Sequence, residues 1–173
     1  MNPLELFKKI TTLVFDVDGV LTDGSLLILP GGVYARRMNI KDGYALQLAV
    51  KQGYHVVVIS GADSPEVIER LNKLGITAVY TNVKNKVEVL QNYLSANNLT
   101  WNEVLYMGDD MPDFEVMQKV ALACCPADAV NEIKQLCGYI SYVNGGMGCA
   151  REIIEKIMKV NGHWVHDGEI RSK

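Results

Sequence analysis

Polar side chains follow several apolar segments of this sequence, at the point where each segment ends. They are Asp16 and Asp18 after residues 12–15, Ser60 after residues 55–59, and Asp109, Asp110 and Asp113 after residues 103–107. In a parallel sheet the carboxyl ends of neighbouring strands form one edge, where ligands bind. We therefore expect these side chains to converge, together with Lys86, which opens a helix candidate.

Such a cluster is suited to the transfer of a phosphoryl group. Converging carboxylates repel one another and raise their pKa values unless a cation neutralises them, and a few oxygen ligands suit Mg²⁺, which also orients and neutralises a phosphoryl group. Asp16 is placed to attack phosphorus, and Asp18 to protonate the leaving oxygen and later activate water. Ser60 can donate to the phosphoryl group, and Lys86 supplies a positive charge.

The elements that must position these residues alternate in the order of βαβ units. Apolar, β-branched segments predict buried strands at residues 12–15, 55–59, 78–80, 103–107, 120–123 and 139–142. Amphipathic segments predict helices at residues 44–52, 65–74, 86–97, 113–119, 129–136 and 149–159. This order predicts an α/β fold, a Rossmann-like, doubly wound and mostly parallel sheet. About residues 25–38 break the order and predict a β-hairpin that turns at Pro30-Gly31-Gly32.

Length and charge limit the class of protein. With 173 residues we expect one domain, 1–173, ending in a flexible polar tail at about 161–173. The net charge of −3 argues against nucleic-acid binding. The four cysteines lack the spacing of a metal or redox site, so we expect free thiols in a cytoplasmic protein. No apolar run approaches the ~20 residues that span a bilayer, so no membrane partner is expected.

Four motifs of this sequence resemble, in order, those of the haloacid dehalogenase (HAD) superfamily. They are Asp16-Val17-Asp18-Gly19-Val20-Leu21-Thr22, then Ser60, then Lys86, and finally Gly108-Asp109-Asp110-Met111-Pro112-Asp113. In that superfamily the second aspartate, here Asp18, goes with phosphatase activity. The resemblance implies that Mg²⁺ is held by Asp16, the backbone carbonyl of Asp18, and Asp109. It gives Asp110 and Asp113 supporting roles around these ligands.

The gaps between the motifs are too short for the cap domain that covers the active site in many superfamily members. The chain therefore resembles the capless subclass, whose members form homotetramers in which hairpins pack together and neighbouring subunits complete each active site. The apolar run Leu26-Leu27-Ile28-Leu29 would be a liability if exposed in a monomer, which agrees with this implication. The alternative is a hairpin that folds onto its own sheet.

Within the capless subclass the chain resembles phosphatases of 3-deoxy-D-manno-octulosonate 8-phosphate (KDO 8-phosphate), which act in lipopolysaccharide synthesis through an aspartyl-phosphate. The resemblance rests on Asn39 to Tyr44, on Gly145 to Gly148 and on Arg151-Glu152. It implies a substrate site formed by Asp18, Asn39, Ile40, Lys41, Asp42, Gly43, Gln47, Arg70 and Lys86.

Two alternatives remain at this point. Many of these phosphatases carry arginine where this chain has Ala62, and relatives acting on nonulosonate 9-phosphates, of the sialic acid type, often carry glutamate. Alanine gives neither signature, so a nine-carbon substrate is the first alternative. The second is a catalytically weak scaffold or binding module.

Overall fold

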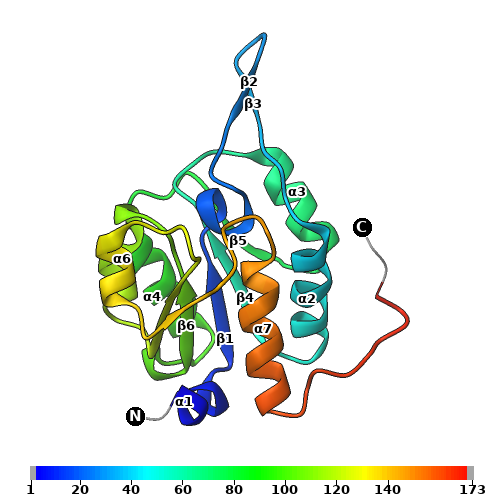
Figure 1. The fold of residues 1–173 in the computed structure, drawn as a ribbon, viewed down its shortest axis with the longest axis vertical. Coiled ribbons are helices and arrows are strands. Elements are labelled where there is room, and N and C mark those ends of the chain that lie inside the picture. The colour runs from blue at the N-terminus through cyan, green and yellow to red at the C-terminus, as the bar shows by residue number, and fades with distance from the viewer. Residues whose placement is uncertain (1–2, 171–173) are drawn as a thin grey trace.

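The chain folds around a six-stranded, entirely parallel sheet, shown in Figure 1 by a computed structural model that describes residues 3–170. The strand order is β5-β4-β1-β6-β7-β8. The strands are β1 (Thr12–Phe15), β4 (His55–Ile59), β5 (Ala78–Tyr80), β6 (Val104–Met107), β7 (Leu122–Cys125) and β8 (Tyr139–Ile140). The α/β parallel fold expected from the sequence is confirmed.

Helices cover both faces of the sheet. They are α1 (Pro3–Lys9), α2 (Ile40–Lys51), α3 (Pro65–Lys73), α4 (Lys86–Ala96), α5 (Phe114–Met117), α6 (Asn131–Leu136) and α7 (Cys149–Val160). The helices α1, α2, α3 and α7 bury their apolar residues in one core, and α4, α5 and α6 bury theirs in a second core on the other face. None of the helices described is both long enough and apolar enough to cross a bilayer.

The alternation of side chains along each strand explains the two cores. Leu13 and Phe15 point into the first core, whereas Val14 between them points into the second. Successive residues of a strand face opposite sides of a sheet, so a strand buried on both faces must be apolar throughout. This burial fixes the sheet, and with it the loops at its carboxyl edge.

The order of the strands opens a crevice at the carboxyl end of β1. From β1 the chain runs to β4 and β5 on one side, and then crosses to β6 on the other side of β1. Such a reversal of direction marks the ligand site of open α/β sheets. Thr12 pairs with His55 of β4 and with Val104 of β6, so the loops after β1 and β6 emerge side by side.

Some element boundaries differ from those that the sequence predicts. Helix α2 begins at Ile40 rather than at residue 44, because the Asn39 side chain caps it by accepting from the Lys41 N–H at 2.9 Å. Strand β7 begins at Leu122 rather than at residue 120. The short helix α1 was not predicted.

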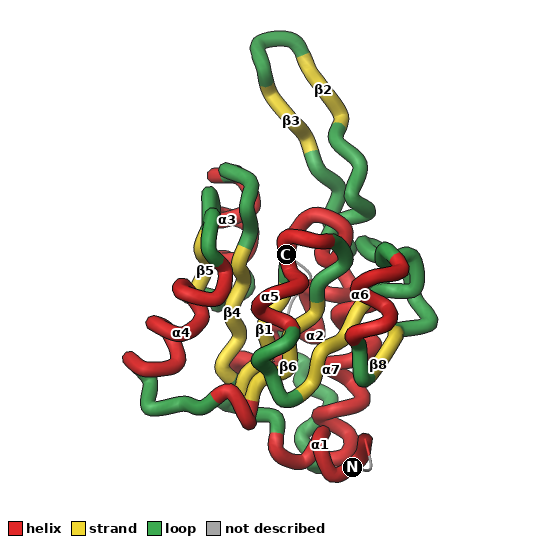
Figure 2. Tube along the Cα trace, turned by 90° about the vertical axis from the view of Figure 1, so that its left-hand side faces the viewer, coloured by secondary structure: helices red, strands yellow, loops and turns green. Residues whose placement is uncertain are grey.

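The hairpin stands apart from the sheet. Within the described part of the chain, its strands β2 (Leu27–Leu29) and β3 (Val33–Ala35) pair only with each other, and they project beyond the body of the molecule (Figure 1, Figure 2). Leu27 and Ile28 are 63% and 72% exposed. The alternative of a hairpin folded onto its own sheet is therefore wrong, and among the described residues no cap domain is evident.

The segment after α7 lies along α2 and α7. The Trp164 ring meets Tyr44 edge to face, and the Arg151 guanidinium lies over both rings. Farther on, Asp167 pairs with Lys51 of α2 at 2.6 Å. The flexibility expected of the tail stays a prediction, and its residues 171–173 lie outside the described part of the chain.

A buried carboxylate joins α2 to α7. Asp42 is 2% exposed, and its Oδ1 accepts from the Arg151 N–H in the first turn of α7 at 2.7 Å. Burial raises the pKa of Asp42 from 3.8 to about 6, although the Arg151 N–H and guanidinium act in the opposite direction. Asp42 thus caps a helix at a cost in desolvation that depends on pH.

Replacing Asp42 with Asn should flatten the pH dependence of stability. Because the folded pKa lies above the unfolded one, the destabilisation is absent below about pH 4 and grows until about pH 6. The free energy of unfolding of Asp42→Asn should therefore improve relative to wild type by on the order of 2 kcal/mol between about pH 4.5 and pH 7. Urea unfolding at several pH values measures this, and a difference that does not change with pH would contradict it.

Candidate active site

The residue after β1 lies at the centre of the carboxyl edge. The Asp16 N–H donates to the Met107 carbonyl of β6 at 3.0 Å, which ties the start of this loop to the sheet. Gly19, three residues on, has φ +86°, and a Cβ there would lie 2.0 Å from Asp109 Oδ2. Only glycine permits this approach, so the loop after β1 can meet the loop after β6.

A lysine buried at the start of α4 joins two of the carboxylates. Lys86 Nζ lies 2.9 Å from Asp16 Oδ1 and 2.7 Å from Asp113 Oδ1. Asn85 caps α4 by accepting from the Glu88 N–H, which fixes the point where Lys86 enters the site. Burial opposes the positive charge of Lys86, but the two carboxylates outweigh it and raise its pKa, so the ammonium stays charged.

Both carboxylate oxygens of Asp113 are bound by neighbouring groups. Its Oδ1 also accepts from the Tyr106 hydroxyl at 2.7 Å, and its Oδ2 accepts from the Asp109 N–H at 3.2 Å. Asp113 therefore holds both Lys86 and the start of the loop that carries Asp109. Asp110 beside it is exposed and accepts from the Met111 N–H.

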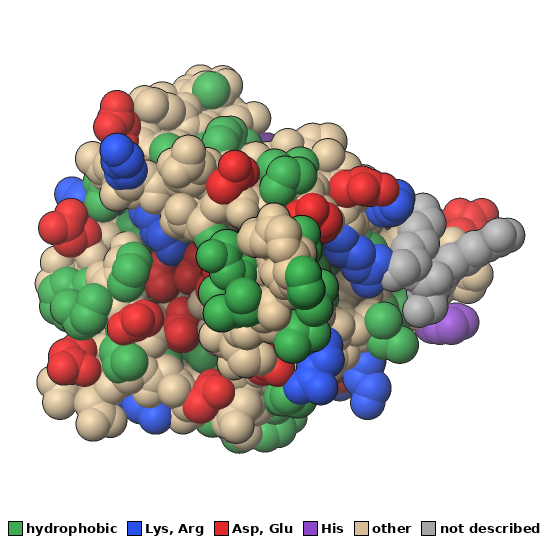
Figure 3. All heavy atoms as spheres, turned by 90° about the horizontal axis from the view of Figure 1, so that it is seen from above, with side chains coloured by type: hydrophobic (Ala, Val, Ile, Leu, Met, Phe, Trp, Pro, Cys, Tyr) green, Lys and Arg blue, Asp and Glu red, His purple; other side chains and the backbone are tan. Residues whose placement is uncertain are grey.

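Three carboxylates gather at this edge in a way that can bind a metal ion. Asp16, Asp109 and Asp113 each offer an oxygen within 4.8 Å of the others. Burial and then Asp113 raise the pKa of Asp16 to about 7, with Lys86 acting against them. Burial and then Asp16 and Asp113 raise the pKa of Asp109 to about 7. Figure 3 shows acidic side chains at the base of a hollow beside the hydrophobic hairpin. The cluster needs more positive charge than Lys86 provides, so its donor set fits a hard divalent cation.

Ser60 and Asp18 occupy the same edge of the sheet. Ser60 directly follows β4, the strand next to β1, is buried, and accepts from the Ala62 N–H at 3.2 Å. Asp18 is paired with Arg36, whose Nε lies 2.6 Å from Oδ1 and whose Nη2 lies 3.2 Å from Oδ2. The sequence analysis did not single out Arg36, because no sequence pattern shows that the segment after β3 contacts the loop after β1.

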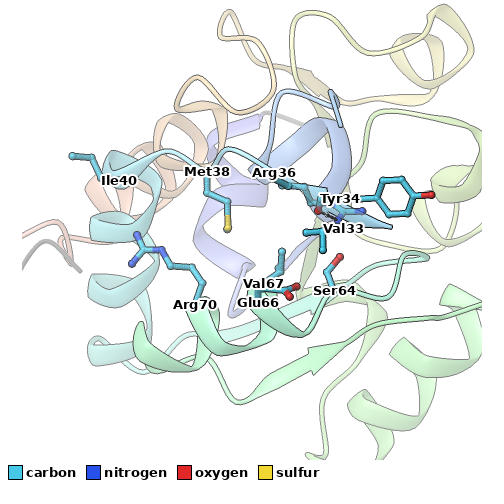
Figure 4. A pocket seen from close by; sticks show the side chains of 10 residues that line it. Val33, Tyr34, Arg36, Met38, Ile40, Ser64, Glu66, Val67 and Arg70 are labelled. Carbon is cyan, nitrogen blue, oxygen red and sulfur yellow. Dashed lines mark hydrogen bonds between the residues drawn. The ribbon is translucent and has the colours of Figure 1, made fainter. Parts of the chain in front are cut away.

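Apart from Asp18 and Lys86, which are described above, the residues predicted to bind substrate fall into two groups. Ile40 and Arg70 line a cavity beside the hairpin (Figure 4), and Lys41 is exposed nearby at the start of α2. The others are engaged within the fold: Asn39 caps α2, Asp42 caps α7, Gly43 lies against Arg70, and Gln47 donates to the Gly43 carbonyl at 3.2 Å.

A parallel sheet with this carboxylate cluster after β1 defines the class of the haloacid dehalogenase-like hydrolases, and residues 77–153 match the family of that description. The 3-deoxy-D-manno-octulosonate 8-phosphate phosphatase KdsC of Escherichia coli K12 is 32% identical to this chain. The match covers 90% of this chain and 82% of the Escherichia coli protein. The chain belongs to this family of KDO 8-phosphate phosphatases.

Solved structures agree with this assignment. The Yersinia pestis KDO 8-phosphate phosphatase has a TM-score of 0.90 and 29% identity, covering 92% of this chain and 86% of that one. The Moraxella catarrhalis phosphatase, in complex with magnesium, phosphate and KDO, has a TM-score of 0.88 and 27% identity over 92% of each chain. The protein is a HAD phosphatase, and measured turnover on sugar phosphates would decide against the alternative of a catalytically weak scaffold or binding module.

A divalent cation should stabilise the fold through Asp109. Millimolar Mg²⁺ should raise the thermal midpoint by on the order of 5 °C, because it relieves the repulsion within the cluster. Asp109→Asn should lose most of this rise, and the control Asp110→Asn should keep it. Differential scanning calorimetry with Mg²⁺ or EDTA makes the measurement. An Asp109→Asn variant that responds as wild type does would contradict the assignment.

Proposed function

We propose that this protein hydrolyses 3-deoxy-D-manno-octulosonate 8-phosphate to KDO and phosphate, with Mg²⁺ as cofactor and an aspartyl-phosphate on Asp16. The proposal rests on one observation, the cluster of Asp16, Asp109 and Asp113 at the carboxyl edge of the sheet. Lys86 forms ion pairs with two of these carboxylates. The relatives that act on this substrate support the choice of sugar acid. The four free cysteines suit a reducing, cytoplasmic setting.

Asp16 has one carboxylate oxygen available for attack. Lys86 binds Oδ1, which leaves Oδ2 to form the bond to phosphorus while the bond from phosphorus to the sugar oxygen breaks. Asp18 gives its proton to the departing sugar oxygen. It then takes a proton from the water that attacks phosphorus, which releases phosphate and restores Asp16.

The other residues of the site hold and neutralise charge. Asp16, the Asp18 carbonyl and Asp109 would hold Mg²⁺, which would supply positive charge against the carboxylates and the phosphoryl oxygens. Ser60 donates a hydrogen bond to the phosphoryl group, and Lys86 offsets its charge. Asp113 acts through Lys86, which it keeps oriented.

The competing substrate is a nonulosonate 9-phosphate. Ala62 provides neither the arginine of many eight-carbon phosphatases nor the glutamate of many nine-carbon ones. Steady-state kcat/KM on both phosphates decides between them, and we expect the eight-carbon compound to be preferred. A preference for the nine-carbon compound would overturn the substrate and leave the chemistry intact.

Replacing Asp16 with Asn tests the chemistry. The amide cannot form the acyl phosphate, so kcat should fall by about a thousandfold or more. Circular dichroism should show an unchanged fold, because the amide oxygen can still accept from Lys86. Turnover of Asp16→Asn within tenfold of wild type would refute the nucleophile.

We further propose a homotetramer that forms through the hairpins and completes the active sites. Support comes from the hydrophobic residues exposed on β2 and β3, among them Ile28 at 72%. Ile28→Asp should break the assembly, because a carboxylate buried without a partner is strongly unfavourable. The control Ile140→Asp, at an exposed position of β8, should not. Sedimentation velocity measures this, and a monomeric wild type would contradict the proposal.

A further inference from the structure

The contact between Asp18 and Arg36 conflicts with the role of a general acid. The pair is bidentate, so both oxygens of Asp18 are held by the guanidinium. A general acid must bring an oxygen to within hydrogen-bond reach of the leaving group. Asp18 must therefore leave Arg36 before the sugar oxygen can be protonated.

Arg36 cannot be left alone at low cost. Its side chain is 9% exposed, although its partner Asp18 is 35% exposed. A buried charge that loses its partner is strongly destabilised, whereas exchange of one carboxylate for another keeps the charge paired. The motion of Asp18 is thus favourable when a second anion takes its place on Arg36.

A cavity of about 540 Å³ lies next to Arg36 and can hold a ligand that carries such an anion (Figure 4). It is formed by β3, the start of α2 and the first turns of α3, and its walls are largely apolar. Its volume falls within the range of small-molecule sites, which combine apolar walls with a few placed polar groups. The lining residues are Val33, Tyr34, Ala35, Arg36, Met38, Ile40, Ser64, Glu66, Val67 and Arg70.

Ser64 gives a second indication of a ligand in this cavity. It is 4% exposed, and its Oγ is buried without a hydrogen-bond partner among the described residues. Ser64 also precedes α3, yet its side chain does not cap the helix. A buried hydroxyl without a partner is costly, and an acceptor on a bound molecule would relieve that cost.

The charged residues around the cavity would be balanced by one additional negative group once Asp18 has moved away from Arg36. Arg36 and Arg70 oppose Glu66, and Asp18 on Arg36 completes the balance. When Asp18 turns away, one positive charge is left without compensation. A substrate carboxylate matches it in sign, and its planar shape matches the guanidinium fork.

We propose that Arg36 binds the carboxylate of the sugar acid. This carboxylate displaces Asp18 from the guanidinium, and Asp18 is then free to protonate the leaving oxygen. Ser64 donates its hydroxyl to the same carboxylate. This inference rests on the proposed function and names the residue that recognises the sugar acid in a chain with Ala62 instead of arginine. Selectivity for a carboxylated substrate and release of the acid are then one event.

The test compares substrates with and without a carboxylate. Arg36→Gln should raise KM for 3-deoxy-D-manno-octulosonate 8-phosphate by about tenfold to a hundredfold, because a charge-assisted bidentate contact is lost. For D-arabinose 5-phosphate, which has no carboxylate to displace Asp18, KM should stay within about threefold of wild type, whereas kcat should rise by about threefold or more because Asp18 is no longer held by Arg36. Arg36→Lys should give an intermediate KM, since it keeps the charge and loses the fork.

Arg37→Gln is the matched control. Arg37 is the next residue, its side chain is 74% exposed, and it pairs with Asp23 away from the cavity, so its loss should not change the selectivity. Ser64→Ala provides a test independent of Arg36, and should raise KM for the octulosonate alone by about threefold to tenfold. Thermal unfolding verifies that each variant is folded.

Equal changes on both substrates would overturn the inference, because Arg36 would then only hold Asp18 or the hairpin. An unchanged KM for the octulosonate in Arg36→Gln and Ser64→Ala would overturn it as well. Failure of the proposed function has a different signature. In that case the wild-type enzyme would not turn over the octulosonate at all, whatever residue stands at position 36.

Discussion

The active site depends on one buried ammonium group that lies between two carboxylates. Lys86 bridges Asp16 and Asp113 at distances below 3 Å, and Asp113 in turn binds Tyr106 and the backbone of Asp109. Without Lys86, three acidic groups would meet at one edge with no positive side chain among residues 3–170 in contact with them. Burial, and the repulsion that the single charge of Lys86 does not balance, raise the pKa values of Asp16 and Asp109, and the cluster could hold a cation.

The sheet and the projecting hairpin contribute different residues to the site. Strands buried on both faces position Asp16, Ser60 and Asp109, which follow β1, β4 and β6. The hairpin supplies Arg36 and one wall of the adjoining cavity. In the proposed mechanism, the contact between Arg36 and Asp18 links substrate selection to catalysis, and the exposed apolar residues of the hairpin would form the proposed assembly.

The sequence was sufficient to predict the sheet and the residues at its carboxyl edge. Apolar runs set the strands, and the residue after each run had to lie at the edge where parallel strands end. Contacts that depend on tertiary packing were not predictable in this way. Asp42, which stays a predicted substrate residue, also accepts from the Arg151 N–H of α7, and Arg36, which the sequence did not single out, binds Asp18. The helix α1 lacked a strong periodic pattern, and its seven residues gave little signal.

The most direct test of the account is to trap the covalent intermediate. Rapid quenching of the enzyme during turnover of 3-deoxy-D-manno-octulosonate 8-phosphate, followed by borohydride reduction, converts an aspartyl-phosphate to homoserine. Mass spectrometry of the peptides should find homoserine at position 16 and nowhere else. Reduction at another aspartate, or continued turnover with no modified residue, would contradict the assignment of Asp16 as the nucleophile.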